Sequence, residues 1–433
     1  MRRIVLLWLV SGAAALAETH AIVNARIVPV TSAPIEKGTV VLRDGRIAAV
    51  GAKVAVPKEA KKIEAAGLSV YPGMVDAYTT LGLAEIPSVR GSMDTTEIGA
   101  FNPQAHAWIA VNPHSEMIRT ARVNGITTAL VAPSGGRIAG SAAAINLFGN
   151  YPNEMLLRPQ VGVVMNIPSS RQRGGRSMLE LLVPGTPEGG EARGERTAEE
   201  LAKLKEYLRE AKAYSDMKAR LEKSGGSLGA ARDAGLEAMV PVIRGERVVI
   251  VPADHWRDIK AAVELAQEFG LRIVIAGGAD AWKIAPYLKE KNVPVLYGAV
   301  HSLPRLPEDP YDAYYAAPEV LRRAGVRFAL VTGGGGQGGG AAADVRNLPY
   351  KAAMAAAYGL EKEDALKAVT LWPAELMGVA DKVGSIEAGK LANLLVIRGD
   401  PLDVRSEVKY VFVEGKLVPL ESRNTEMFER FGQ

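Results

Sequence analysis

The chain has 433 residues, 48% of them hydrophobic and 23% charged, which is enough apolar material for two or three domain cores. This balance excludes an intrinsically disordered or collagen-like protein. Cysteine is absent, so disulfides, thiolate zinc sites, iron–sulfur clusters and cysteine nucleophiles are excluded.

The first residues have the pattern of a secretory signal peptide. Arg2 and Arg3 precede the apolar run Ile4–Val10, and small residues at alternate positions close the segment at Ala17. We expect cleavage near Ala17, so residues 1–17 are removed and the mature protein is periplasmic or secreted. The net charge is +4, or +2 without the two arginines, which is too small to indicate a nucleic-acid partner. The apolar run is shorter than the roughly 20 residues of a membrane span, and we expect no membrane span later in the chain.

Both ends of the mature chain predict short strands. Val- and Ile-rich segments flank the turns Asp44-Gly45 and Glu414-Gly415, a pattern typical of β-hairpins. The predicted strands are Ala21–Val30, Gly38–Leu42, Ile47–Val50, Leu394–Ile397, Tyr410–Val413 and Lys416–Val418. We therefore predict a small composite β-sandwich domain built from residues 18–70 and 381–420.

The middle of the chain alternates apolar strands with helical patterns, which indicates an α/β fold with a parallel sheet buried on both faces. The predicted strands are Ser69–Asp76, Thr127–Val131, Val161–Asn166, Val248–Val251, Arg272–Ala276, Pro294–Tyr297 and Arg327–Val331, with Ala143–Phe148 as a candidate eighth. The predicted helices are His114–Val123, Trp256–Glu268, Trp282–Glu290, Ala317–Arg323 and Tyr350–Tyr358. This pattern predicts a (β/α)8 TIM-like barrel over residues 71–380, with a doubly wound sheet as the alternative.

Residues 169–233 interrupt this alternation. A Gly- and Arg-rich start leads into a charged helix from about Thr197 to Lys223. We interpret the segment as an insertion that serves as a lid or an interaction surface.

Several motifs, in this order, resemble those of the amidohydrolase superfamily, in particular its imidazolonepropionase-like branch. They are Asn24–Ile27, Leu42–Ile47, Tyr71–Asp76, Gly125–Thr128, Ala368–Ala374, Gly384–Leu394 and Val411–Lys416. The resemblance covers most of the mature chain. It implies a barrel with a small β domain and a hydrolase that acts on non-peptide C–N bonds.

The resemblance also implies a divalent metal, which activates water and polarises the carbonyl of the substrate. The usual ligands are a His-x-His pair, a lysine in binuclear members, two single histidines and an aspartate. No lysine stands clearly at a strand end in the expected place. The His-x-His pair would fall on Tyr78 and Thr80. The two single histidines would fall on Pro252 and on Gly277-Gly278, and the aspartate on Gly333–Gly336. None of these residues supplies a neutral imidazole, so we expect the ordinary binuclear site to be missing.

Residues that follow barrel strands are the candidates for chemistry, because barrel active sites lie at the carboxyl ends of the strands. We expect Asp254, Lys283 and His301 as catalytic residues. Tyr78, Thr80 and Trp282 are the expected substrate-binding residues. His255 could act as a general base beside Asp254, or Asp254 could instead cap the helix that begins at Trp256.

Two other features admit both a functional and a structural interpretation. His106 and His114 could bind a metal with Glu97 or Glu116, although their spacing fits neither a helix nor a strand. The glycine run Thr332–Gly340 could bind an anion through its amides, or it could be a loop left where the metal-binding aspartate would stand. We expect no cofactor, and a divalent metal such as zinc would need ligands outside the usual pattern.

Two functions therefore remain open. The first is an exported hydrolase of the amidohydrolase type that cuts a small amide or cyclic amide. The second is a catalytically inactive barrel that binds a small ligand or a protein partner. Such a barrel could form a homo-oligomer, or a hetero-oligomer with a related amidohydrolase.

Overall fold

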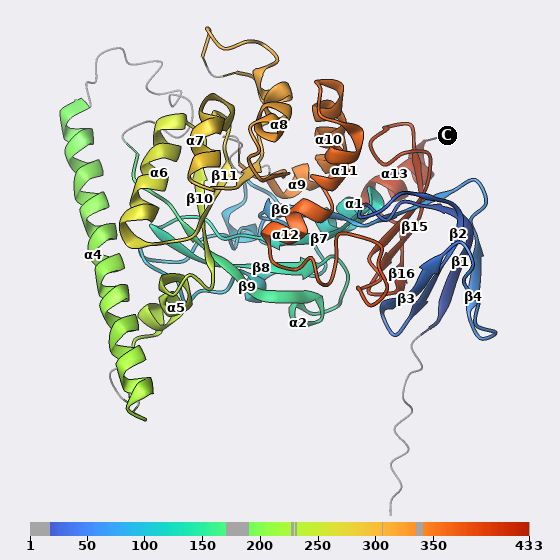
Figure 1. Ribbon diagram of the computed structural model, residues 1–433, viewed down its shortest axis with the longest axis horizontal. Helices are drawn as coiled ribbons and strands as arrows, with labels where there is room; N and C mark the ends of the chain where they lie inside the picture. Colours follow the sequence, from blue (N-terminus) through green and yellow to red (C-terminus); the bar gives the residue numbers. More distant parts are fainter. Residues whose placement is uncertain are drawn as a thin grey trace, which may run out of the picture.

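The computed structural model describes residues 18–169, 190–226, 229, 232–304, 306–334 and 341–432. The predicted signal peptide and most of the glycine run lie outside the described residues. Within them, no helix combines the length and the apolarity that a membrane span requires. Figure 1 shows a sheet at one end of the molecule, a second sheet surrounded by helices in the middle, and the long helix α4 at the opposite end.

The first sheet joins strands from both ends of the chain. Its order is β16-β15-β14-β5-β1-β2-β3, and β4 also pairs with β1. The strands are β1 His20–Ile27, β2 Ile35–Arg43, β3 Arg46–Gly51, β4 Lys61–Glu64, β5 Ser69–Pro72, β14 Leu394–Arg398, β15 Glu407–Val413 and β16 Lys416–Val418. Asp44 and Gly45 both have positive φ (51° and 76°), as the predicted tight hairpin turn requires.

The strands predicted for the composite domain all belong to one hydrogen-bonded sheet, which forks at β1. The first half of β1 pairs with β4, and its end at Arg26–Ile27 pairs with β5. The larger apolar core of this sheet includes Ile22, Leu42 and Phe412, so the two ends of the chain are packed together.

The second sheet has eight strands in chain order, from β6 to β13. They are β6 Met74–Thr79, β7 Ile126–Val131, β8 Ile138–Asn146, β9 Leu156–Met165, β10 Val248–Ala253, β11 Ile273–Gly277, β12 Val295–Tyr297 and β13 Phe328–Leu330. The apolar run Ser69–Asp76, predicted as one strand, is divided between β5 in the first sheet and β6 in the second.

The second sheet is mostly parallel, but β8 runs antiparallel to both β7 and β9. The connection from Val131 to Ile138 holds no helix and is too short to return the chain for parallel pairing. The expectation of an entirely parallel sheet is therefore wrong at this strand.

Side chains from all eight strands meet in one apolar cluster on the inner side of this sheet. The cluster includes Val75, Leu130, Ala142, Val164, Ile250, Val274, Leu296 and Ala329, one from each strand. The two edge strands also approach each other, because the Gly333 amide after β13 donates to the Tyr78 carbonyl of β6 at 2.9 Å. The carboxyl ends of β6 and β13 are thus neighbours.

Helices such as α6, α7, α8 and α10 lie along the second sheet, whereas α13 lies beside the first sheet (Figure 1). The helices of the described residues are α1 Glu116–Val123, α2 Pro152–Met155, α4 Gly190–Lys223, α5 Ala234–Ile243, α6 Trp256–Phe269, α7 Ala285–Glu290, α8 Ala313–Arg323, α9 Ala341–Asp344, α10 Leu348–Ala357, α11 Lys362–Lys367, α12 Leu371–Leu376 and α13 Arg423–Phe431. The described residues also form 3-10 turns at Arg90–Ser92, Ala107–Ala110, Ala281–Ile284 and Val345–Asn347.

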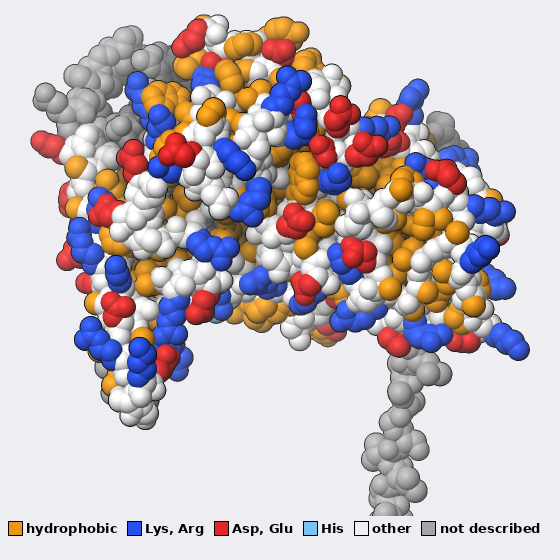
Figure 2. Space-filling model, viewed as in Figure 1, with side chains coloured by type: hydrophobic (Ala, Val, Ile, Leu, Met, Phe, Trp, Pro, Cys, Tyr) orange, Lys and Arg blue, Asp and Glu red, His pale blue; other side chains and the backbone are white. Residues whose placement is uncertain are grey.

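The predicted insertion contains α4, a helix of 34 residues. Leu204 and Leu208 are fully buried, and Tyr207 stacks on Phe101 with ring centroids 4.5 Å apart. Lys203 pairs with Glu199 at 2.7 Å on the exposed side, and Figure 2 shows acidic and basic side chains interspersed along this helix. The helix is therefore packed against α5 and Phe101 through apolar residues on one of its sides.

Candidate functional site

The carboxyl ends of the strands are packed together through glycines. A Cβ on Gly298 would lie 2.2 Å from the Gly333 carbonyl oxygen, and one on Gly333 would lie 2.4 Å from the Tyr78 oxygen. A Cβ on Gly334 would lie 2.5 Å from the Gly277 Cα. Since real Cβ contacts are never this short, these positions accept only glycine without a shift of the backbone.

The residues at the expected metal positions lie at or next to the strand ends. Tyr78 lies at the end of β6 and Pro252 within β10, while Gly277 and Gly333 contribute backbone to the close contacts described above. The described residues contain no group of three or more His, Cys, Asp or Glu side chains arranged to hold a metal ion. At these positions Tyr78 offers a hydroxyl, and Pro252, Gly277 and Gly333 offer only backbone oxygens, in place of the imidazoles that zinc prefers.

A charged cluster forms after β10, β11 and β12. The Lys283 ammonium lies 2.6 Å from Asp309 Oδ1 and 3.6 Å from Asp280 Oδ1. Asp254 accepts the Ala279 amide at 3.4 Å, and its carbonyl accepts the Asp280 amide at 2.8 Å. The side chains of Asp280 and Asp309 are 3% and 5% exposed, so two buried carboxylates flank one ammonium.

His255 caps α6, which begins at Trp256 as predicted. Its Nδ1 accepts the Arg257 amide at 3.1 Å, so the cap is His255 itself and not Asp254. The other ring nitrogen, Nε2, lies 3.8 Å from Asp280 Oδ2. Because the accepting nitrogen of the neutral ring is used by the helix, His255 is poorly placed to take a proton from water.

Two buried tyrosines lie beneath this cluster. The Tyr297 hydroxyl donates to the Tyr314 carbonyl at 3.1 Å. Burial raises the pKa of Tyr297 well above its ordinary value, and the nearby Tyr314, Asp254 and Asp280 raise it further. Tyr297 is therefore neutral at all physiological pH values.

A second polar network joins β6 to β12 and β13. Asp76 is fully buried and accepts the amides of Tyr78 and Thr332, each at 3.2 Å, as well as the Thr332 hydroxyl. Burial raises the pKa of Asp76 to about 6, against the lowering effects of these hydrogen bonds and of Lys351. Lys351 of α10 is also buried, and its ammonium donates to the Gly298 carbonyl at 3.1 Å.

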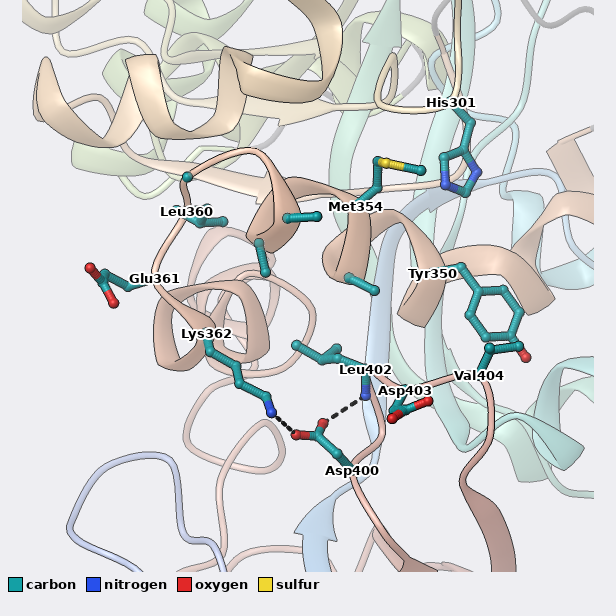
Figure 3. A pocket seen from close by; sticks show the side chains of 14 residues that line it. His301, Tyr350, Met354, Leu360, Glu361, Lys362, Asp400, Leu402, Asp403 and Val404 are labelled. Carbon is teal, nitrogen blue, oxygen red and sulfur yellow. Dashed lines mark hydrogen bonds and ion pairs between the residues drawn. The ribbon is translucent and has the colours of Figure 1, made fainter. Parts of the chain in front are cut away.

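His301 lies apart from Asp254 and Lys283. It lines a cavity of about 910 Å³ between α10, α11 and the loop around Asp400, as Figure 3 shows. Burial lowers the pKa of His301, and the Lys351 charge lowers it further. The structure thus brings Asp254 and Lys283 together around Asp280, whereas His301 lines a cavity with Tyr350 to which neither of them contributes.

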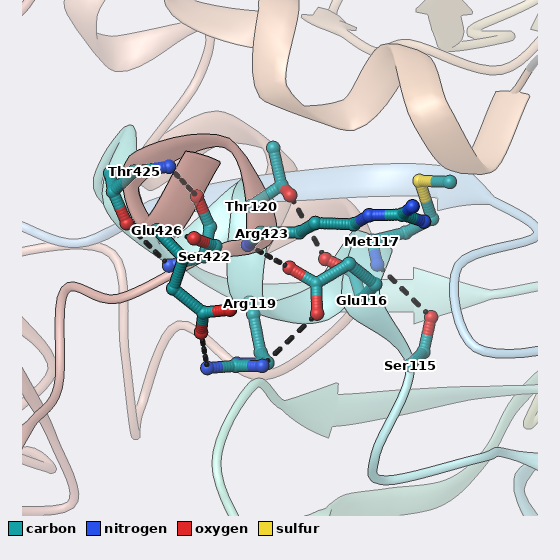
Figure 4. A network of polar contacts seen from close by, with 9 residues as sticks. All are labelled: Ser115, Glu116, Met117, Arg119, Thr120, Ser422, Arg423, Thr425 and Glu426. Atoms are coloured by element: carbon teal, nitrogen blue, oxygen red, sulfur yellow. Dashed lines mark hydrogen bonds and ion pairs between the residues drawn. The ribbon is translucent and has the colours of Figure 1, made fainter. Parts of the chain in front are cut away.

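The other candidate metal residues are also dispersed. His106 contacts the Gln160 amide nitrogen at 3.2 Å, and burial lowers its pKa. Glu116 instead accepts Arg119 at 3.1 Å and the Arg423 amide at 2.6 Å, which fixes the start of α13 (Figure 4). Glu97 is exposed. The network in Figure 4 therefore has a structural explanation.

Sequence reasoning missed Asp309, Asp344 and Lys351. Asp309 lies in the loop between β12 and α8, where only the fold shows that it meets Lys283. Lys351 lies within a predicted helix, where a lysine is ordinarily exposed. The apolar and small residues around it in Leu348–Ala357 were the one available signal that this helix is buried on most sides.

Comparison with known proteins agrees with this architecture. Residues 310–418 match the amidohydrolase family. An amidohydrolase from Thermotoga maritima is 27% identical with a TM-score of 0.76, covering 92% of this chain and 99% of that one. A zinc-bound adenosine deaminase from Xanthomonas campestris shares the fold at 17% identity and a TM-score of 0.52, covering 93% of this chain and 92% of that one.

A curated relative, Amidohydrolase tasK of Hapsidospora irregularis, is 22% identical over 403 residues, which is 88% of this chain. The chain spans 39% of the length of that relative. The protein is thus an α/β protein that shares its fold with the amidohydrolase from Thermotoga maritima. The predicted resemblance to the amidohydrolase superfamily is confirmed.

Proposed function

We propose that the protein is an exported hydrolase that cuts the C–N bond of a small amide or cyclic amide without the usual binuclear metal centre. The observation that supports it is the cluster of Asp254, Asp280, Lys283 and Asp309 after β10, β11 and β12. In barrels, this end of the strands is where substrates bind.

The chemistry of the proposal is metal-free acid–base catalysis. Asp254 accepts a proton from water while the hydroxide adds to the carbonyl carbon, and Lys283 stabilises the oxygen that becomes negative. The proton then passes to the amide nitrogen, the C–N bond breaks, and the products are a carboxylic acid and an amine. Asp280 and Asp309 hold the Lys283 ammonium in place through their ion pairs.

Tyr78, Thr80 and Trp282 are the proposed substrate contacts. Trp282 Nε1 is buried and donates no hydrogen bond among the described residues, so it can donate to an oxygen of the substrate. The proposal gives His301 no role in the reaction, because it lines the separate cavity.

The test is to incubate the purified mature protein with a panel of small amides, lactams and cyclic imides and to measure the amine that hydrolysis releases. Lys283→Met and Asp254→Asn should each lower kcat/KM by about 100-fold or more. Lys289→Met is the matched control, because Lys289 is exposed on the neighbouring helix α7 and should leave turnover unchanged. Equal activity in all three variants would refute the assignment.

The alternative is a catalytically inactive barrel that binds a ligand or a partner. The glycine contacts between Gly277, Gly298, Gly333 and Gly334 favour it, since backbone occupies the space around the expected metal positions. Under this alternative, the amide panel gives no turnover, and co-purification from the native host recovers a related amidohydrolase or a second copy.

The same proposal includes a closed barrel over residues 71–380, a composite domain from residues 18–70 and 381–420, and export. The contact between Gly333 and Tyr78 supports closure, and the shared first sheet supports the composite domain. Expression of the full chain with amino-terminal sequencing of the periplasmic product tests export, with Glu18 expected as the first residue.

A further inference from the structure

Lys351 is a buried cation at the carboxyl ends of the second sheet. Its side chain is 2% exposed, and its ammonium lies 3.0 Å from Asp344 Oδ2. The ammonium also donates to the Gly298 carbonyl at 3.1 Å and to the Thr332 carbonyl at 3.4 Å. Three oxygens from three different segments thus surround one positive charge.

These segments are the ones that must be held together where the sheet's edge strands meet. Gly298 follows β12, Thr332 follows β13, and Asp344 ends α9. Thr332 in turn binds the Asp76 carboxylate of β6 through its amide and its hydroxyl. The chain of contacts from Lys351 through Thr332 to Asp76 therefore crosses from β12 and β13 to β6.

Carbonyl and carboxylate oxygens that converge on one point need a cation, because their partial and full negative charges repel each other. The described residues hold no group of three or more His, Cys, Asp or Glu side chains for a metal ion here, and the Lys351 ammonium already occupies the point on which these oxygens converge. We propose that the Lys351 ammonium is a built-in structural cation that joins β6, β12 and β13 in the place of a metal ion.

The enclosure of Lys351 separates this role from catalysis. Its ammonium is saturated by two carbonyls and a carboxylate, which are its three available donor directions. The inference holds whether or not the protein hydrolyses amides, because it concerns stability alone. Its test therefore uses the melting temperature of the mature protein.

Lys351→Ala removes three methylenes and the ammonium, which together are the size of n-propylammonium. The variant should melt at least about 5 °C below wild type, because it leaves a carboxylate and two carbonyls without their cation. Added n-propylammonium should restore most of this loss, whereas 1-propanol, which has the same chain and no charge, should not. Lys367→Ala is the control, because Lys367 is 32% exposed and pairs with Asp364 at the surface of α11.

Equal rescue by 1-propanol, or no loss of melting temperature, would overturn the inference in favour of packing by the lysine stem alone. If Lys351→Ala does not fold, Asp344→Asn replaces it, since Asp344 is 28% exposed and its loss should still lower the melting temperature. An unchanged melting temperature in Asp344→Asn would then count against the inference. A fall in the melting temperature of wild type on adding a chelator would also overturn it, because a metal would then stabilise the fold.

Discussion

Asp76 makes a prediction about how stability depends on pH. Its carboxylate is fully buried within β6, and it accepts hydrogen bonds from the amides of Tyr78 and Thr332. Asp76→Asn keeps the shape and the acceptor oxygen, and its amide group can donate to the Thr332 hydroxyl. The variant therefore removes the titration of this group with little change in packing.

The magnitude follows from the pKa of Asp76, which is about 6 in the folded protein against an ordinary value of 3.8. Because the folded pKa is raised, the contribution of Asp76 to stability is fully present below pH 3.8 and is lost as the pH rises through 6. Between pH 4.5 and 7, wild type should therefore lose about 2 kcal/mol relative to Asp76→Asn.

The assay is urea unfolding of both proteins at pH 4.5, 5.5, 6.5 and 7, all at one ionic strength, with the difference in unfolding free energy plotted against pH. Asp403→Asn is the control, because its pKa is lowered to about 2 by Arg405 and its ionisation is complete below this range. A constant difference between wild type and Asp76→Asn would refute the reasoning, since it would mean that the hydrogen bonds and Lys351 outweigh burial.

Three further predictions concern packing. Gly298→Ala should cost about 1–3 kcal/mol of unfolding free energy by urea titration, because its Cβ would overlap the Gly333 carbonyl, whereas Gly91→Ala meets no atom within 4 Å and should cost little. Leu208→Ala should lower the free energy with which α4 packs on the rest of the protein by about 2–5 kcal/mol. Limited proteolysis should then cut α4 faster than in wild type while the second sheet stays folded. Equal rates of cleavage would contradict this packing. Glu116→Gln should lower the free energy of unfolding by under about 1 kcal/mol, and amide hydrogen exchange should become faster in α13 alone. Unchanged exchange in α13 would show that Glu116 does not hold this helix.

Local pattern was enough to predict most elements. The Asp44-Gly45 turn, the strand Val248–Val251 and the helix from Trp256 are all found where short-range preferences place them. The reversed direction of β8 was missed because strand direction depends on how the chain returns, and apolar strands have the same composition in either direction.

In the candidate site, too, one part could be predicted from the sequence and another part could not. Residues after strands could be named from the sequence, and the structure joins Asp254 to Lys283 through Asp280. It also places His301 in another cavity, because a loop residue four positions past β12 can turn to either side of α10.

The sequence by itself determined the alternation of elements and the two β-rich ends, and it predicted that the expected metal positions lack imidazoles. Only the tertiary structure decided what the glycines at those positions do, since their role is a close approach between segments far apart in the chain. The role of Lys351 was likewise decided by the tertiary structure. A lysine in a helix carries no sign of its partners, and its burial became visible only when Gly298, Thr332 and Asp344 were brought around it.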